Sequence, residues 1–346
     1  MTQQQLDELY MRRCLQIARG GLLTAKPNPS VGAVIVAADG RIIGEGFTAP
    51  YGGPHAEVNA FAAVSADDEP LLKGATIYVS LEPCAHWGHT PPCCDLIISK
   101  GVRRCVCGCT DPYVKVQGEG IRRIREAGIE VTVGVLADDC RKANRAFMTT
   151  HQRQRPYVIL KWAETANHII GRRPTSGQGT AEPPLRLSSA FTQMMVHQLR
   201  AGADAILVGR GTLEADRPQL NVREWWGRSP ERMVLTTHPE RVPGGYRTFS
   251  DIDSLFEYMM AENRQTLLVE GGTQTLNTFI AAGQWDEMRV ETAPFTIEEG
   301  VAAPALPPAA RLAKTCWVDG RCIRLYERDE EAEREKNLIN PPICTK

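Results

Sequence analysis

Residues 75–84 read ATIYVSLEPC. The first seven are mostly apolar, aromatic or β-branched, a composition typical of a short buried strand. Cys84 follows this run, so it lies just beyond the carboxyl end of the expected strand. In open α/β sheets this edge is where ligands bind. The stretch therefore predicts an α/β sheet that presents a cysteine at its ligand-binding edge.

Two further segments supply side chains of matching chemistry. His55-Ala56-Glu57 follows a proline, so a helix can begin there with the imidazole in its first turn. A helix expected over residues 93–100 follows two prolines and carries Cys93 at its N-terminus, where the helix dipole favours a thiolate. One imidazole and two thiolates suit zinc and leave its fourth position open for water, which marks catalytic zinc. We therefore expect His55, Cys84 and Cys93 to bind one zinc ion.

Glu57 is expected to act as a proton carrier and not as a ligand. It lies two residues after His55, where its carboxylate can take a proton from metal-activated water and pass it to a leaving amine. Zinc nucleobase deaminases divide the work in this way. Eight residues separate the two cysteines, whereas two is the usual deaminase spacing. Two other interpretations stay open: buried thiols with a surface histidine, and a structural zinc completed by His86 or Cys94.

The composition limits the class of protein. A length of 346 residues predicts two domains. Hydrophobic residues make up 42% and charged residues 23%, which predicts a soluble globular chain. The formal net charge of −1 and the lack of an 18-residue apolar run argue against nucleic-acid and membrane partners. Eleven cysteines without an N-terminal signal sequence read as reduced thiols, so we expect a cytoplasmic location.

Strands and helices are expected to alternate through the first half. The periodicity predicts helices over residues 6–18 and 117–127 and strands over residues 31–36, 42–47, 102–110 and 129–133. This alternation favours a sheet covered by helices on both faces. Cys105, Cys107 and Cys109 alternate along one expected strand and are interpreted as buried apolar side chains, with a second metal site as the alternative. Basic and polar linking material is expected from about residue 144 to 155.

The second half begins with an apolar strand over residues 157–163 that carries Lys161, either a site residue or a snorkelling edge residue. A further strand is expected at residues 205–209. The turn after it suits a phosphate group, and the alternative is an ordinary loop that caps a helix. The strongest signal is Glu270-Gly271-Gly272 after a third apolar strand. Two glycines followed by hydroxyl-bearing helix starters form a nest of N–H donors for pyrophosphate. The Rossmann glycine fingerprint is absent from this turn.

Several of these motifs resemble one family when they are taken in order. The segments PNPSVG at residues 27–32, HAE at 55–57, LEPCAH at 81–86 and TPPC at 90–93 resemble the bifunctional riboflavin-biosynthesis deaminase/reductases. In that family the longer gap between the cysteines is the rule. The resemblance implies a cytidine-deaminase-like three-layer α/β/α domain at residues 1–148, followed by a dihydrofolate-reductase-like α/β domain at 155–328. Residues 329–346 are expected to form a charged tail, to which we assign no function.

The resemblance also implies an activity. Zinc-bound hydroxide would deaminate a diaminohydroxyphosphoribosylaminopyrimidine, and NADPH would then reduce the ribosyl group to ribityl. The partners would be these small molecules, and the chain would form a homo-oligomer, a dimer or tetramer. Two alternatives stay open. One is a nucleoside or tRNA deaminase fused to a cofactor-binding module. The other is a zinc-bearing regulatory protein with an inactive reductase half, because Asn167-His168 replaces the family's usual Asp-Gly and Arg186 stands near a common aromatic position.

The family's site residues transfer to matching positions of this chain. Glu57 would be catalytic, with zinc on His55, Cys84 and Cys93. The expected cofactor contacts are Ala163, Thr212, Asp216, Thr237, Gly272, Thr273, Gln274, Thr275 and Leu276. The expected substrate contacts are Asn28, His86, His89, Asp111, Lys161, Ser188, Arg200, Leu220, Arg223 and Glu270. His89 stands where the family has a lysine or arginine, and we expect it to contact the substrate phosphate.

Overall fold

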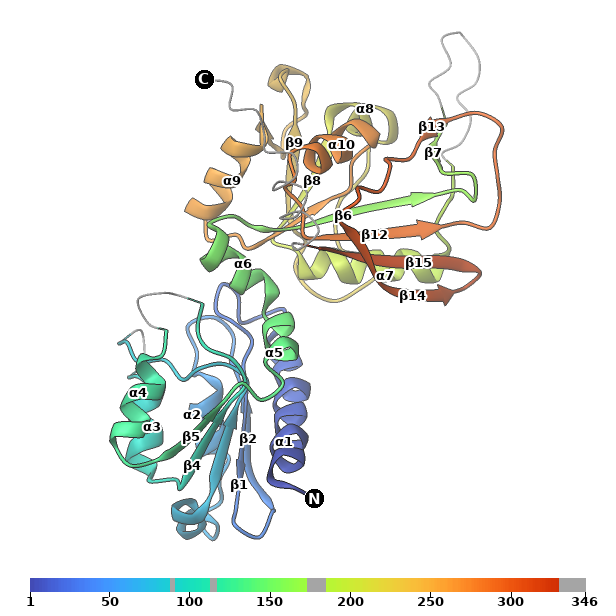
Figure 1. Ribbon diagram of the computed structural model, residues 1–346. Coiled ribbons are helices and arrows are strands. Elements are labelled where there is room, and N and C mark those ends of the chain that lie inside the picture. The colour runs from blue at the N-terminus through green and yellow to red at the C-terminus, as the bar shows by residue number, and fades with distance from the viewer. Residues whose placement is uncertain (88–90, 113–116, 173–184, 330–346) are drawn as a thin grey trace, which may run out of the picture. The chain divides into compact units, whose positions relative to one another are not determined.

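The computed structural model describes residues 1–87, 91–112, 117–172 and 185–329 (Figure 1). The chain divides into two compact units, Met1–Gln154 and Arg155–Lys346. Each unit has a hydrophobic core of its own. Most of the charged tail expected at the C-terminus, residues 330–346, lies outside the described residues.

A five-stranded sheet forms the centre of the first unit, in the order β2-β1-β3-β4-β5. The strands are β1 Gly32–Val36, β2 Ile42–Phe47, β3 Thr76–Val79, β4 Arg104–Cys107 and β5 Glu130–Val133. β1 is antiparallel to β2 and β3, whereas β3, β4 and β5 are parallel to one another. The carboxyl ends of these three parallel strands therefore meet at one edge, and Cys84 follows the end of β3.

Helices cover both faces of this sheet. They are α1 Gln3–Ala18, α2 Ala56–Ala62, α3 Cys93–Lys100, α4 Glu119–Glu126, α5 Ala137–Ala143 and α6 Arg145–Arg153, with 3-10 turns at Arg19–Gly21 and Glu69–Gly74. α1 and α5 lie together on one side, and α2, α3 and α4 lie on the other (Figure 1). Fully buried Met11 from α1 and Ile97 from α3 fill the two interlayer spaces. The expected three-layer α/β/α architecture is confirmed.

The second unit contains an eight-stranded sheet in the order β10-β9-β8-β11-β6-β12-β15-β14 and a separate β13-β7 pair. The strands are β6 Tyr157–Glu164, β7 Ile169–Gly171, β8 Ala205–Gly209, β9 Glu231–Leu235, β10 Arg247–Phe249, β11 Thr266–Val269, β12 Glu287–Thr292, β13 Val301–Ala302, β14 Ala310–Val318 and β15 Arg321–Arg328. The first six strands of the large sheet are parallel, and β15 and β14 close it as an antiparallel hairpin. This is the α/β unit that was expected.

The two faces of the large sheet differ in polarity. The helices of this unit are α7 Ala190–Gly202, α8 Arg210–Asp216, α9 Ile252–Ala261 and α10 Thr273–Ala281, with a 3-10 turn at Pro239–Arg241. α9 and α10 pack their apolar side chains against Leu160 and Trp162 of β6. On the opposite face α7 makes polar contacts, from Thr192 to Glu291 and from Arg200 to Glu270. A buried polar layer therefore lies under α7.

The prediction of a linker at residues 144–155 is wrong, because most of this segment forms α6. Phe147 and Met148 pack against the core of the first unit, so this basic segment has an apolar face. The buried Asn144 side chain accepts from Ser30 N at 2.8 Å and donates to Ser30 O at 3.1 Å. Burial of Asn144 and Met148 makes the segment part of the first unit.

Two other expectations need correction. The strand expected at residues 102–110 ends at Cys107, and the chain bends at residues 108 and 109, so Cys109 lies beyond the strand. Both of these cysteines and Cys105 are buried, in agreement with their interpretation as apolar side chains. Lys161 is not on an edge strand, because β6 lies between β11 and β12. Every helix in the described part of the chain is too short or too polar to cross a membrane.

Candidate active site

His55, Cys84 and Cys93 come together at one point of the first unit. His55 Nδ1 lies 3.6 Å from Cys84 Sγ and 3.3 Å from Cys93 Sγ. The three potential ligand atoms all lie within 4.8 Å of one another. Zinc bonds sulfur at about 2.3 Å and imidazole nitrogen at about 2.0–2.1 Å, so tetrahedral ligands stand roughly 3.6 Å apart. The donor set and its spacing therefore fit one zinc ion.

Three different local structures place these side chains. His55 is the N-cap of α2, Cys84 follows β3, and Cys93 is the first residue of α3. Cys93 N donates to Cys84 Sγ at 3.3 Å. Hydrogen bonds from Cys93 and His55 lower the pKa of the Cys84 thiol. A thiolate is the form that binds a metal, so Cys84 is ready to bind a cation.

Glu57 lies in the first turn of α2 and is only 4% exposed. Burial raises its pKa to about 7, and the neighbouring charge of Cys84 acts in the same direction. A carboxyl group with a pKa near neutrality can both accept and release a proton at physiological pH. The cluster therefore has an acid/base group beside it, buried from solvent.

The expected substrate contacts of this unit are only partly placed. Asn28 is half-buried, His86 is exposed and Asp111 is half-buried. His89 lies outside the described residues.

Two residues that the sequence analysis missed hold the surrounding loops. Glu82 Oε2 accepts hydrogen bonds from Asp111 N at 3.1 Å and Gly118 N at 3.0 Å, so it ties together both ends of the segment between β4 and α4. Asn144 fixes Ser30, two residues after Asn28, through the pair of hydrogen bonds described above. Glu82 stands directly before Pro83-Cys84 and was visible as part of that motif, whereas Asn144 carries no local signal.

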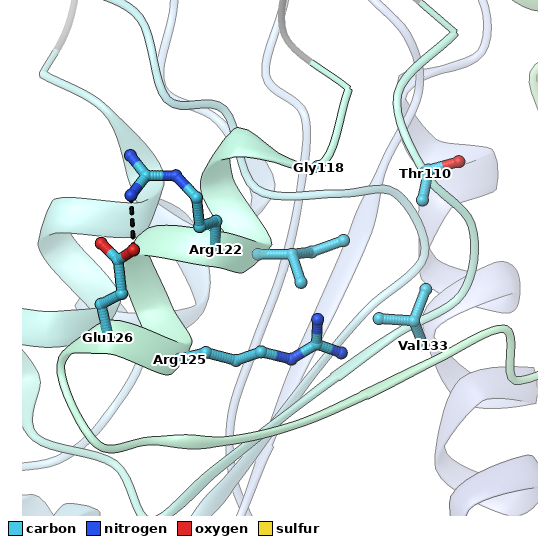
Figure 2. Close-up of a pocket in the computed structure, with 7 residues that line it drawn as sticks. Thr110, Gly118, Arg122, Arg125, Glu126 and Val133 are labelled. Carbon is cyan, nitrogen blue, oxygen red and sulfur yellow. Dashed lines mark hydrogen bonds and ion pairs between the residues drawn. The ribbon is translucent and has the colours of Figure 1, made fainter.

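A shallow pocket of about 400 Å³ also lies in the first unit, between α4 and the end of β5 (Figure 2). Thr110, Gly118, Ile121, Arg122, Arg125, Glu126 and Val133 line it. Arg122 pairs with Glu126 at 2.5 Å and with Glu119 at 2.7 Å. Because none of the metal-cluster residues lines this pocket, we assign it no ligand.

Lys161, Glu270 and Arg200 form the charged centre of the second unit. Val269 is paired with Leu160 in the sheet register. The next residues on the two strands, Glu270 and Lys161, therefore lie side by side at the carboxyl edge of the sheet. Arg200 donates from Nε and Nη2 to the two oxygens of Glu270, at 2.9 and 2.8 Å. Burial lowers the pKa of Lys161, although the charge of Glu270 opposes the shift. Two expected substrate contacts, Arg200 and Glu270, therefore pair with each other.

A loop that carries two further expected contacts packs against α7. Leu220 is 1% exposed and adopts a positive φ of 52°. Arg223 is exposed, and its backbone N donates to His197 Nδ1 at 3.0 Å. Arg200 Nη1 donates to Asn221 O at 3.2 Å. The helix therefore fixes the path of this loop by its backbone, and His197 is a third residue that the sequence analysis did not identify.

The turn after β11 lies against the start of α8. Thr212 Oγ1 accepts a hydrogen bond from Gly272 N at 2.9 Å. A Cβ atom at Gly271 would stand 2.8 Å from Thr275 Cβ, so only glycine permits this approach. Gly272 is the N-cap of α10, which leaves the first N–H groups of that helix for an acceptor. The arrangement suits a phosphate-bearing cofactor.

The remaining expected contacts of this unit differ in their exposure to solvent and in their hydrogen bonds. Ala163 is half-buried on β6, and Ser188 is half-buried just before α7. Asp216, Thr237 and Gln274 are exposed. Thr273 Oγ1 donates to the Ala302 carbonyl. Leu276 points into the apolar core, and its N–H donates to Gly272 O, so its side chain and its amide are both engaged within the unit.

The substituted turn after β6 is formed despite the loss of its usual acid. Asn167 Oδ1 accepts from Thr165 Oγ1 at 2.7 Å, and Asn167 Nδ2 donates to Ile297 O at 2.8 Å. His168 takes a positive φ of 60°, and its Nδ1 lies 2.9 Å from Glu164 Oε1. The amide of Asn167 therefore supplies the acceptor that an aspartate would supply.

Comparison with family models assigns both halves of the chain. Residues 4–109 match the cytidine and deoxycytidylate deaminase zinc-binding region, and residues 156–315 match the RibD C-terminal domain. The chain is 32% identical over 332 residues to riboflavin biosynthesis protein RibD of Aquifex aeolicus, covering 86% of this chain and 90% of that protein. RibD of Bacillus amyloliquefaciens is 34% identical over 338 residues, covering 87% and 88%.

Solved structures give the same result over both units. Acinetobacter baumannii RibD superposes with a TM-score of 0.80 at 29% identity, covering 94% of this chain and all of that chain. A Thermotoga maritima diaminohydroxyphosphoribosylaminopyrimidine deaminase/5-amino-6-(5-phosphoribosylamino)uracil reductase superposes with a TM-score of 0.83 at 30% identity, with the same coverage.

Proposed function

Because this chain belongs to the RibD family of bifunctional riboflavin-biosynthesis enzymes, we propose that its two units perform two consecutive steps through the residues described above. The chain is a deaminase of a phosphoribosylaminopyrimidine joined to a reductase that converts the ribosyl side chain to ribityl. Its cofactors are zinc and NADPH. The alternative of a deaminase fused to an unrelated module is wrong, because both halves match one family over most of the chain.

In the deaminase we assign the metal to His55, Cys84 and Cys93, whose spacing supports this role. Zinc, when bound, supplies the Lewis acid that activates water. Glu57 takes the proton from the attacking water and delivers it to the amine that leaves the pyrimidine ring. Its burial supports this shuttle, because solvent does not compete for the proton. Asn28, His86, His89 and Asp111 are proposed to orient the substrate.

In the reductase we place NADPH where the N-terminal ends of α8 and α10 lie next to each other. Thr212, Asp216 and the turn of Gly272 are the proposed contacts, with Ala163, Thr237, Thr273, Gln274, Thr275 and Leu276 as the remaining ones. NADPH, when bound, supplies the hydride. Lys161 is assigned the proton that the opening sugar oxygen requires, because it is a half-buried cation in the same row as Glu270. Ser188, Arg200, Leu220, Arg223 and Glu270 are proposed to hold the substrate.

Three finer assignments complete the proposal. The deaminase is proposed to extend through α6 to Gln154, as the compact unit does. Assembly as a homo-oligomer, a dimer or tetramer, is proposed through β14, an edge strand on which Trp317 is 72% exposed. A cytoplasmic location is proposed because free thiols persist in reducing compartments, and the ten described cysteines are unpaired.

The single observation that carries the deaminase assignment is the His-Cys-Cys cluster with a buried carboxyl group beside it. The test is a coupled assay on the diaminopyrimidine substrate with and without NADPH. We expect Glu57→Gln to lower deamination by at least about 10²-fold while zinc content and reduction of deaminated substrate are unchanged. Asp216→Ala is expected to impair reduction only. An active Glu57→Gln deaminase contradicts the proposal.

A further inference from the structure

Arg289 carries a buried positive charge that the reductase assignment leaves unexplained. It lies on β12, between β6 and β15, and its side chain is 7% exposed. Within the described part of the chain, neither of its terminal nitrogens Nη1 and Nη2 has a hydrogen-bond partner. A buried cation acts strongly on nearby ionisable groups, because the surrounding dielectric is low.

The sheet register places Arg289 beside Lys161. The two residues are paired across the parallel strands β12 and β6, so their side chains leave the same face about 4.8 Å apart. On the other side of β6 the same row continues with Glu270. Lys161 therefore stands between a guanidinium on one neighbouring strand and a carboxylate on the other.

The groups around Lys161 carry two positive and two negative charges. Glu270 follows β11, Arg289 and Glu291 lie on β12, and Arg200 comes from α7. Arg200 binds both oxygens of Glu270, whereas Arg289 stays 3.6 Å from the nearest oxygen of Glu291, beyond hydrogen-bond distance. Lys161 is therefore surrounded by two cations and two carboxylates, and Arg289 is the cation whose terminal nitrogens make no hydrogen bond within the described residues.

We propose that Arg289 is a positioning residue of the reductase, which promotes proton release from Lys161 to the sugar oxygen. The inference rests on the proposed function. In the step it serves, the carbon–oxygen bond of the ribose ring breaks, and its electron pair stays on oxygen. Hydride from the nicotinamide cofactor adds to the carbon, and the Lys161 ammonium gives its proton to that oxygen. Lys161 is left as a neutral amine and regains a proton from water.

The electrostatics agree with this role. Burial lowers the pKa of Lys161 below its ordinary value of 10.5, and the Arg289 and Arg200 charges act in the same direction. Glu270 and Glu291 oppose them. Arg289 makes the larger of the two cationic contributions, so its charge favours the neutral amine and offsets part of the effect of Glu270.

The test compares Arg289→Gln, which removes the charge, with Arg289→Lys, which keeps it. Lys161 acts in its protonated form, so reduction falls as pH rises through its pKa. We expect Arg289→Gln to move this alkaline limb of kcat/KM upward by about one pH unit and Arg289→Lys to leave it near the wild-type position. Glu291→Gln should move it downward, because that change removes a charge of opposite sign. This opposite shift keeps the test decisive if Arg289→Gln fails to fold.

A second readout separates positioning from mere structural support and needs neither substrate nor cofactor. The rate of Lys161 acetylation by acetic anhydride, followed by mass spectrometry across pH, reports the neutral amine directly. We expect the same order of midpoints: Glu291→Gln lowest, wild type and Arg289→Lys together, and Arg289→Gln highest. Equal midpoints in all variants would overturn the inference. A wild-type chain that oxidises no NADPH with deaminated substrate would overturn the reductase assignment instead, while the acetylation series would still decide the role of Arg289.

Discussion

Glu270 and Arg200 illustrate how two site residues can hold each other in place before substrate binds. Their side chains are about nine-tenths buried and joined by two hydrogen bonds. Although burial opposes ionisation, the charges of Lys161 and Arg200 lower the pKa of Glu270 below its ordinary value of 4.5. The pair therefore stays ionised and fixes the guanidinium of Arg200 near Lys161.

Glu270→Gln should destabilise the reductase unit at neutral pH. The change leaves Arg200 without its counter-charge, a loss of about 3 kcal/mol for a buried pair. Because the folded pKa of Glu270 is depressed, the ionised pair stabilises the wild type above pH 4.5, and this contribution is lost as pH falls through the folded pKa. Hydrogen exchange of β11 and β12 in urea measures the effect. The difference from wild type should persist at pH 7 and shrink below about pH 4.5.

Glu214→Gln is the matched control for that experiment. Glu214 forms an exposed pair with Arg210 four residues earlier in the same unit. Exposed pairs contribute at most about 1 kcal/mol, so the control should unfold nearly as the wild type does. Equal stability of the two variants at pH 7 would show that the Glu270 pair contributes no more than an exposed one.

At the residue scale, the sequence predicts which side chains carry the chemistry better than it predicts which side chains pair with each other. His55, Cys84 and Cys93 were identified because each stands in a short motif with a defined chemical use. The pairing of Arg200 with Glu270 was not predictable, since the two are 70 residues apart and meet only through sheet order. Arg289 had no local signal, because the alternating charges of the strand EMRVET do not reveal which neighbouring strand they will face.

At the scale of elements, α7 acts as a support for the loop of residues 219–224. His197 is fully buried, and its Nδ1 accepts from Arg223 N, which requires the neutral tautomer with its proton on Nε2. Burial and the charge of Arg200 lower the pKa of His197, which favours this neutral form. The loop therefore depends on one imidazole nitrogen for a backbone contact.

His197→Phe should loosen this loop, whereas His197→Asn should hold it. Phenylalanine leaves the Arg223 amide without an acceptor, at a cost of about 1–3 kcal/mol, while the asparagine oxygen can take the place of Nδ1. Ordering the loop then becomes part of substrate binding, so we expect the reductase KM to rise about tenfold with kcat nearly unchanged. Steady-state kinetics with deaminated substrate measures both constants. An equal rise in the two variants would mean that volume, and not the hydrogen bond, matters.

Helix α6 shows why one element escaped prediction. Its basic residues suggested a linker, but its buried face consists of Met148, Thr149 and Thr150, of which only the methionine is strongly apolar. The long strand expected at 102–110 failed for the opposite reason, because its apolar composition continues past Cys107, where the backbone bends. Composition detects burial in the second segment but not in the first, and in neither does it set where regular structure begins and ends.

At the scale of the whole molecule, both units place their candidate residues by the same rule. Cys84 follows β3, Glu270 follows β11, and α8 begins directly after β8. Parallel strands bring all their carboxyl ends to one edge, so residues distant in sequence gather there. The order of the motifs along the chain therefore predicts where each unit gathers its candidate residues. The order of the strands within each sheet was not predictable, because it depends on contacts across the whole unit.

The large sheet ends in β14, and this exposed strand leads to the last prediction. Leu312 is 51% and Trp317 is 72% exposed, and an unpaired strand edge with large apolar side chains is a ready surface for another strand. Replacing both residues with aspartate should convert an oligomer into a monomer of 38.2 kDa in sedimentation velocity. Trp226→Asp is the control, since Trp226 is 65% exposed in a loop of the same unit. A wild-type monomer, or an oligomer that survives both substitutions, would rule out assembly through β14.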